Sequence, residues 1–117
     1  MSNLAQQIFA VDDIESELLE IAQWNVTVLV KSMTAKDRAR MIGRSVQANG
    51  NFDLEEVLPD LVIHCTFDPE TGERVFTPAD REMLMSKAAS AIELIATVAM
   101  RLSGMDEDAI ERAGKGL

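Results

Sequence analysis

The chain has 117 residues and a formal net charge of −9, from 20 acidic and 11 basic side chains. This length suits one domain with one modest core. The excess of acid, without any basic tract, argues against binding to a nucleic acid backbone. Apolar residues make up 47% of the chain, so it is expected to fold and not to remain disordered.

Several features of the chain predict its cellular location and its domain boundaries. Residues 1–12 have no basic region and no long apolar run, so they predict a flexible leader and not a signal peptide. No apolar stretch approaches the ~18 residues that cross a bilayer, so no membrane is expected as a partner. A single cysteine, Cys65, excludes an internal disulfide and fits a reducing cytoplasm. We expect a soluble cytoplasmic protein, with residues 13–113 as one α+β domain and residues 114–117 as a frayed end.

The segment from Asp13 to Lys31 predicts a β-hairpin. Residues 14–21 alternate in facing, and Val26 to Lys31 are rich in β-branched side chains. The simplest arrangement reverses the chain near Gln23. An isolated hairpin is marginal in water, so this one is expected to pack on the helical part. Trp24 is expected to pack at the hairpin end, with an exposed interface anchor as the alternative.

Two helices are expected in the middle of the chain. Thr34 and Asp37 form a capping pattern for a helix reaching about Val46. That helix carries the basic cluster, which is either a solvated face or a docking site for an acidic partner. The cluster consists of Lys36, Arg38, Arg40 and Arg44.

Asp53 predicts the start of a third helical segment at Leu54, after a turn over residues 47–51. Pro59 predicts a break or kink in that segment, because proline removes a backbone donor and restricts the preceding residue. Residues 60–67 form an apolar run that fits either a buried helix or a short strand, and helix is favoured. The run Asp68-Pro69-Glu70-Thr71-Gly72 is typical of a turn.

The longest expected element is a central helix over about residues 78–103. Thr77, Pro78 and Asp80 form a start signal, and Gly104 forms a stop signal. Between them there is no glycine or proline. A short polar helix is expected to follow over residues 106–113.

This helix carries more apolar surface than one packing face needs. One stripe recurs at spacings of three and four, and a second apolar edge widens it. Two interpretations stay open: the helix is covered on two sides, or the second edge is exposed as an adaptable methionine-containing surface for another protein. The candidate partner-binding residues are Met85, Ala89, Ala96 and Met100, with Trp24 next.

The sequence offers little for catalysis, a cofactor or a metal ion. His64 and Cys65 are adjacent and so do not share a face, and no second His or Cys could complete a metal site. The acids after Asp68 resemble the start of a calcium loop, but Ala79 stands where such a loop needs a bidentate glutamate. No glycine-rich phosphate loop follows a strand. We therefore expect a non-enzymatic protein with no catalytic, cofactor or metal site.

The order of several short motifs resembles a known family, the tail assembly chaperones of long-tailed phages. The first motifs are Trp24-Asn25-Val26-Thr27-Val28, Met33-Thr34 and Arg38. The later ones are Asp68, Gly72, Phe76-Thr77, Asp80, Leu84, Ser86-Lys87 and Leu102-Ser103-Gly104, followed by an acidic segment. The likeness spans roughly residues 13–112. The motifs are structural, so the resemblance carries over no catalytic residue.

This resemblance implies an α+β fold with an N-terminal hairpin on a mainly helical domain. It also implies a role in tail morphogenesis, in which the protein keeps the tape measure protein, and as a second client the tail tube subunits, soluble. Such a protein would act in the bacterial host cytoplasm as a monomer or weak homo-oligomer and would be missing from the mature virion. Two alternatives stay open: a small acidic regulator that mimics DNA and binds a basic partner, and a minor structural virion component.

Overall fold

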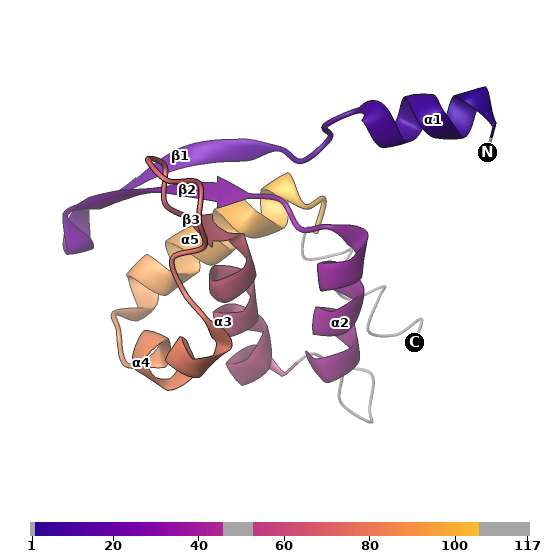
Figure 1. Cartoon of the computed structure of the whole chain (residues 1–117). Coiled ribbons are helices and arrows are strands. Elements are labelled where there is room, and N and C mark those ends of the chain that lie inside the picture. Colours follow the sequence, from indigo (N-terminus) through magenta and orange to yellow (C-terminus); the bar gives the residue numbers. More distant parts are fainter. Residues whose placement is uncertain (1, 46–52, 106–117) are drawn as a thin grey trace.

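The computed structural model describes residues 2–45 and 53–105. Their helices are α1 (Asn3–Ala10), α2 (Ala35–Ser45), α3 (Leu54–Cys65), α4 (Arg81–Met85) and α5 (Ala89–Leu102). The strands are β1 (Ser16–Ile21), β2 (Val26–Lys31) and β3 (Thr66–Phe67), with 3₁₀ turns η1 (Ala22–Trp24) and η2 (Pro78–Asp80). Figure 1 shows the sheet lying across α5 and α3, with α2 to one side. The α+β fold and the N-terminal hairpin that the sequence predicts are confirmed.

The hairpin is built as the sequence pattern predicts. β1 and β2 pair antiparallel, with Leu19 opposite Val28 and Ile21 opposite Val26. The chain reverses through η1 and Asn25, whose φ of 52° lies in the left-handed region that asparagine tolerates. β3 pairs with the other side of β2, so β1 lies at one edge of the sheet. The hairpin packs on α5, which supplies the apolar cover that it lacks by itself.

The core lies between the inner face of the sheet and helices α3 and α5. It is aliphatic, as expected for a chain with few aromatic residues. Its largest fully buried apolar side chains include Ile21, Val30, Met41, Leu61, Val62, Ile63, Ile95 and Met105. Each such side chain stabilises the fold by about 1.5–3 kcal/mol relative to exposure.

Pro59 does not break the third helix. α3 runs from Leu54 to Cys65 with Pro59 inside it. Of the predicted break or kink, the break is therefore wrong and the kink stays a prediction, whereas the helical interpretation of the first part of 60–67 is correct. Thr66 and Phe67 form the short strand β3. A proline inside a helix costs about 3 kcal/mol. Burial of Leu61, Val62 and other α3 side chains, each at or near 0% exposure, offsets that cost.

The single helix expected over 78–103 is two helices. η2 and α4 end at Met85, and α5 starts at Ala89 after a break in which Ala88 has an extended ψ of 128°. The Ser86 hydroxyl donates to the Met83 carbonyl at 2.6 Å, and such local bonds weaken a helix. Tertiary packing adds a reason. α4 packs on α3, whereas α5 packs on both α3 and the sheet, which one straight rod of about 39 Å could not do around this small core.

The predicted turn and helix end after Cys65 are confirmed. The Gly72 amide donates to the Asp68 carbonyl at 2.8 Å, and Gly72 has a φ of 75°. At the end of α5, Gly104 has a φ of 68°, and the Met105 amide donates to the Met100 carbonyl at 2.7 Å. Glycine takes this left-handed conformation without the steric cost of a side chain.

The leader expected over residues 1–12 contains a helix. α1 is capped by the Ser2 side chain, which accepts from the Ala5 amide at 3.0 Å, and it has no buried residue. Figure 1 shows α1 standing away from the rest of the chain, beyond the start of β1. The predicted turn over 47–51, the polar helix over 106–113 and the frayed end over 114–117 lie outside the described residues.

Candidate functional site

Two adjoining hollows form an apolar groove at the hairpin end of the molecule. Their volumes are about 570 and 520 Å³, and Trp24 and Phe76 line both. The first is completed by Asp80, Met83, Leu84 and Lys87, and the second by Val26, Thr27, Val28, Asp68, Pro69, Glu70 and Val75. We call these residues the hairpin-end groove.

Three separate segments build this groove. Trp24 ends η1, so the hairpin reversal carries it to the end of the sheet. The strand-like segment after Gly72 is held by an isolated bridge between Phe67 and Arg74, and it leads directly to Phe76. The Thr77 amide then donates to an Asp80 carboxylate oxygen at 2.8 Å, which starts η2 and directs α4 along the other wall.

The groove is apolar inside and mainly acidic at its rim. Met83 is 73% exposed, and Val26 and Val75 are 44% and 43% exposed, so large apolar side chains face outward here. The rim carries the carboxylates of Asp68, Glu70 and Asp80 and one ammonium group, Lys87. Such a surface can bury the apolar face of another chain, and methionine adapts to differently shaped partners.

The predicted Met/Ala edge is not one exposed surface. Met85 is 41% exposed and Ala89 is exposed, on either side of the break between α4 and α5. Ala96 is 2% exposed and belongs to the core, and Met100 packs against the core. Trp24 packs against the core as expected and also lines the groove. The five candidate residues are therefore not brought together, although the proposed partner contact of Met85 and Trp24 stays a prediction.

Sequence reasoning missed three outward-facing residues of the groove: Val26, Val75 and Met83. On one continuous helix, Met83 lies outside the apolar stripe and beside the polar face, so its position in the sequence does not indicate a binding role. The break after Met85 leaves it at the mouth of the groove. A sequence signal existed in Phe76-Thr77-Pro78, which places an aromatic residue directly before a helix start.

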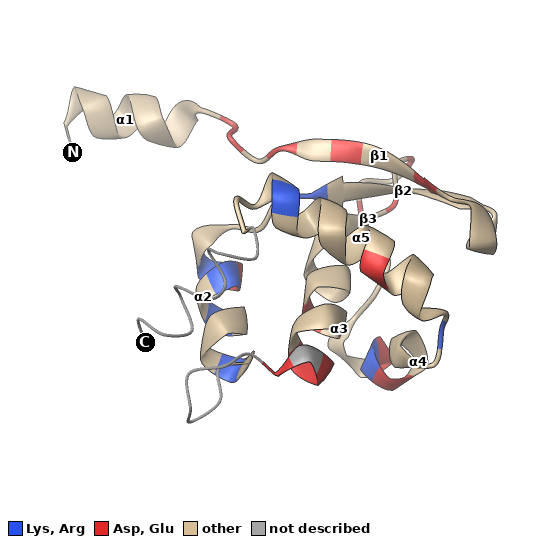
Figure 2. Cartoon of the chain, turned by 180° about the vertical axis from the view of Figure 1, so that it is seen from behind, with Lys and Arg blue, Asp and Glu red and all other residues tan. Residues whose placement is uncertain are grey.

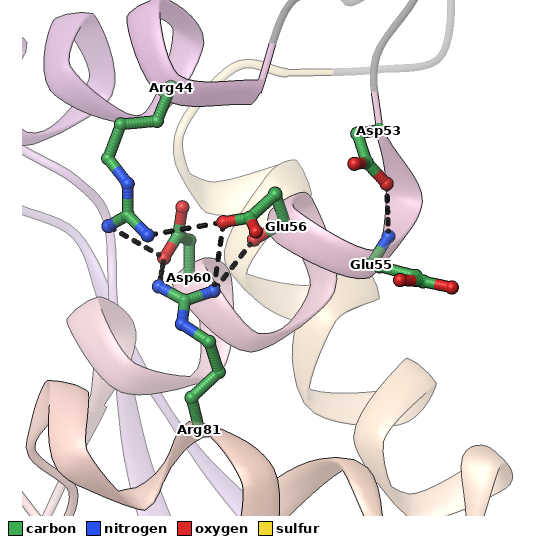
Figure 3. A network of polar contacts seen from close by, with 6 residues as sticks. All are labelled: Arg44, Asp53, Glu55, Glu56, Asp60 and Arg81. Atoms are coloured by element: carbon green, nitrogen blue, oxygen red, sulfur yellow. Dashed lines mark hydrogen bonds and ion pairs between the residues drawn. The ribbon is translucent and has the colours of Figure 1, made fainter.

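A network of four charged residues fixes the wall that α4 contributes. Asp60 of α3 is 1% exposed, and its Oδ1 accepts from Arg81 and lies 3.3 Å from Arg44 Nη1. Glu56 Oε2 lies 3.1 Å from Arg44 Nη2 and 3.4 Å from Arg81 Nη1. Figure 3 shows both guanidinium groups converging on the two carboxylates. The network joins α2 and α4 to α3, and therefore positions the groove wall.

The predicted basic cluster does not form one open patch. Arg44 belongs to this network, and Arg38 Nη1 lies 3.4 Å from the Ser103 carbonyl oxygen, to which it donates. Lys36 and Arg40 are exposed on α2. Figure 2 shows basic residues on α2 and also near α4 and the ends of α5 and β2, with acid along β1 and the segment before it. Docking of an acidic partner on α2 therefore stays a prediction, with Lys36 and Arg40 as exposed cations outside these contacts.

His64 and Cys65 lie on α3 without catalytic geometry. Burial lowers the pKa of His64, whose Nδ1 lies 3.1 Å from Arg74 Nη1. Cys65 is fully buried, and burial raises the pKa of its thiol to about 12, so the thiolate nucleophile is scarce near neutral pH. Across residues 2–45 and 53–105, no three His, Cys, Asp or Glu side chains gather in a way that could hold a metal ion.

None of the helices in the described part of the chain is long and apolar enough to cross a membrane. The arrangement that stands out is thus the hairpin-end groove, whose chemistry is that of apolar contact with another molecule.

Comparison with known proteins finds a solved structure with a similar fold. No family model and no curated protein matches the chain. Among solved structures, the chain is similar to the tail assembly chaperone of bacteriophage HK97, with a TM-score of 0.58 and 15% identity. The match covers 86% of this chain and 98% of that one. At the level of the fold, it confirms the resemblance to phage tail assembly chaperones that the sequence motifs indicate.

Proposed function

We propose that the protein is a non-enzymatic phage or prophage tail assembly chaperone that acts in the host cytoplasm. The observation that carries this proposal is the shared fold with the HK97 chaperone over 86% of the chain, which agrees with the family that the sequence motifs resemble. The apolar hairpin-end groove supports it further, because a chaperone needs a surface that covers exposed apolar side chains of its client.

The client is the tape measure protein, with tail tube subunits as a second candidate. A tape measure protein, as the family resemblance implies, is long, helical and prone to aggregate through its apolar stripe. One such stripe would contact Trp24, Phe76 and Met83, which line the groove. The client then contacts side chains that exclude water, and no bond is made or broken. The net charge of −9 keeps the complex dispersed.

The test is co-expression with the tape measure protein of the same phage or prophage, followed by purification on a tag carried by the chaperone. The wild type should hold the tape measure protein in the supernatant and co-purify with it. Met83→Glu should reduce recovery at least tenfold, because it places a charge at the mouth of the groove. The matched control is Leu18→Glu, since Leu18 is 63% exposed on the sheet, away from the groove.

A further variant, Met85→Glu, tests the candidate residue that the sequence indicates. Met85 is exposed and is the last residue of α4. Equal loss in Met83→Glu and Leu18→Glu, or no loss in either, would contradict the groove as the client site. Failure of the wild type to bind either tail protein would contradict the chaperone function. Binding to a basic protein that disappears at high salt would favour the acidic regulator, and presence in purified virions would favour a structural component.

A further inference from the structure

The detached helix α1 exposes an apolar face that its own chain does not cover. Leu4 is 65% exposed, Ile8 58%, Phe9 74% and Val11 63%. Leu4 and Ile8 are four residues apart and lie on one face, with Ala5 and Phe9 beside them. A helix of this kind needs an apolar surface to cover it. The hairpin-end groove is the apolar hollow of matching character in the described part of the chain.

The α1 of the same chain does not reach this groove. The Glu15 carbonyl accepts from the Ser32 amide at 2.8 Å, so Glu15 continues the sheet. The Ile14 amide donates to Asp12, which shapes the connection. Reversing the chain would use about four residues, which is the whole of residues 11–14. The eight-residue helix, about 12 Å long, would then end short of the far end of β1, about 20 Å away.

In a pair of copies, α1 of each chain could reach the groove of the other chain. α1 projects beyond the start of β1 (Figure 1). The groove begins at the other end of the hairpin, at Trp24 in η1, and continues along β2 and the segment after β3. β1 is an outer strand of the sheet, so two copies could run antiparallel along it. That arrangement would bring each α1 to the hairpin end of the other copy, where the groove begins. The arrangement has twofold symmetry and closes with two identical contacts.

The charge of α1 and the apolar area that it would bury both suit α1 of a second copy as the occupant of the groove. Residues 2–11 carry no acidic or basic side chain, so they bring no carboxylate against the rim formed by Asp68, Glu70 and Asp80. Four large apolar side chains at roughly 100 Å² each remove about 800 Å² from water per contact, counting both sides. Two contacts remove about 1,600 Å², which is the size of a standard specific interface.

We propose that the protein forms a dimer in which α1 of each copy occupies the hairpin-end groove of the other. The dimer covers the groove until a client displaces α1. Its regulatory meaning rests on the proposed function, but the contact itself is measured on the purified protein without any client.

The first experiment is disulfide trapping between singly substituted copies. Copies carrying Phe9→Cys are mixed with copies carrying Met83→Cys, and the native Cys65 is buried and does not compete. The control pairs Phe9→Cys with Lys36→Cys, because Lys36 is exposed on α2 and lines neither hollow of the groove. We expect the first pair to cross-link at least tenfold faster. Equal rates, or an intramolecular disulfide in a monomeric Phe9→Cys/Met83→Cys double variant, would overturn the proposal.

The second experiment is sedimentation velocity of the unmodified full chain over a range of concentrations. We expect a monomer–dimer equilibrium that Phe9→Glu shifts at least tenfold toward monomer, while the melting temperature of the monomer is unchanged. A wild type that stays monomeric, or that forms mainly species larger than a dimer, would contradict the reciprocal contact. Because no tail protein is present, neither result depends on whether the protein is a chaperone.

Discussion

The buried carboxylate of Asp60 is the part of the molecule whose removal has the clearest expected consequence. It is 1% exposed and contacts guanidinium groups from two other elements, Arg44 and Arg81. Asp60→Asn keeps the shape of the side chain and removes its charge. The two arginines then share only Glu56, which is less buried.

The magnitude follows from the burial of each partner. Removing one member of a buried ion pair costs about 3–5 kcal/mol. The Arg44 side chain is 50% exposed and the Arg81 side chain 23%, so solvent screens part of the loss. We therefore expect the low end, about 3 kcal/mol in the free energy of unfolding. For a domain of this size, that lowers the melting temperature by roughly 12 °C.

The assay is urea and thermal unfolding followed by circular dichroism, with Glu55→Gln as the matched control. Glu55 is an exposed carboxylate on the same helix, one residue before Glu56, and Figure 3 shows its side chain apart from the arginines. Its loss should cost less than about 0.5 kcal/mol. The fluorescence of the single tryptophan, Trp24, should also change in Asp60→Asn, because the network positions the α4 wall of the groove. Equal stability of the two variants would refute the reasoning.

Three further outcomes are expected from single sites. Burial raises the pKa of Cys65 to about 12, so the folded state keeps a proton that the unfolded state loses above pH 9. The free energy of unfolding should therefore fall as pH rises above 9, by up to about 1.4 kcal/mol per pH unit. In parallel urea titrations, Cys65→Ala should show a smaller fall. Gly104→Ala should lower the free energy of unfolding in urea by about 1 kcal/mol, because the φ of 68° disfavours a side chain. No atom lies within 4 Å of the added carbon, so a clash does not contribute. An unchanged free energy of unfolding would contradict this backbone strain. Leu84→Ala should lower the free energy of unfolding by about 2–5 kcal/mol, since Leu84 is 3% exposed. Met83 is 73% exposed, so Met83→Ala should change it by less than about 0.5 kcal/mol. Similar losses at both sites would contradict the described orientation of α4.

Local sequence determined much of this protein. The alternation and β-branching of residues 14–31 specified the hairpin, since those patterns depend only on neighbouring side chains. Thr34 with Asp37, Asp53 and Gly104 marked helix ends correctly, because capping satisfies backbone groups within one turn. The ordered motifs also indicated the fold shared with the HK97 chaperone.

Tertiary packing decided the rest. α3 continues through Pro59 because burial of its apolar side chains outweighs a local penalty, and the helix expected over 78–103 bends at 86–88 because two directions of packing are needed around one small core. The groove joins Trp24, Phe76 and Met83, which are far apart in sequence and share no periodic pattern. A surface made by three segments exists only once the chain has folded, so of these three residues the sequence pattern singled out only Trp24 as a candidate.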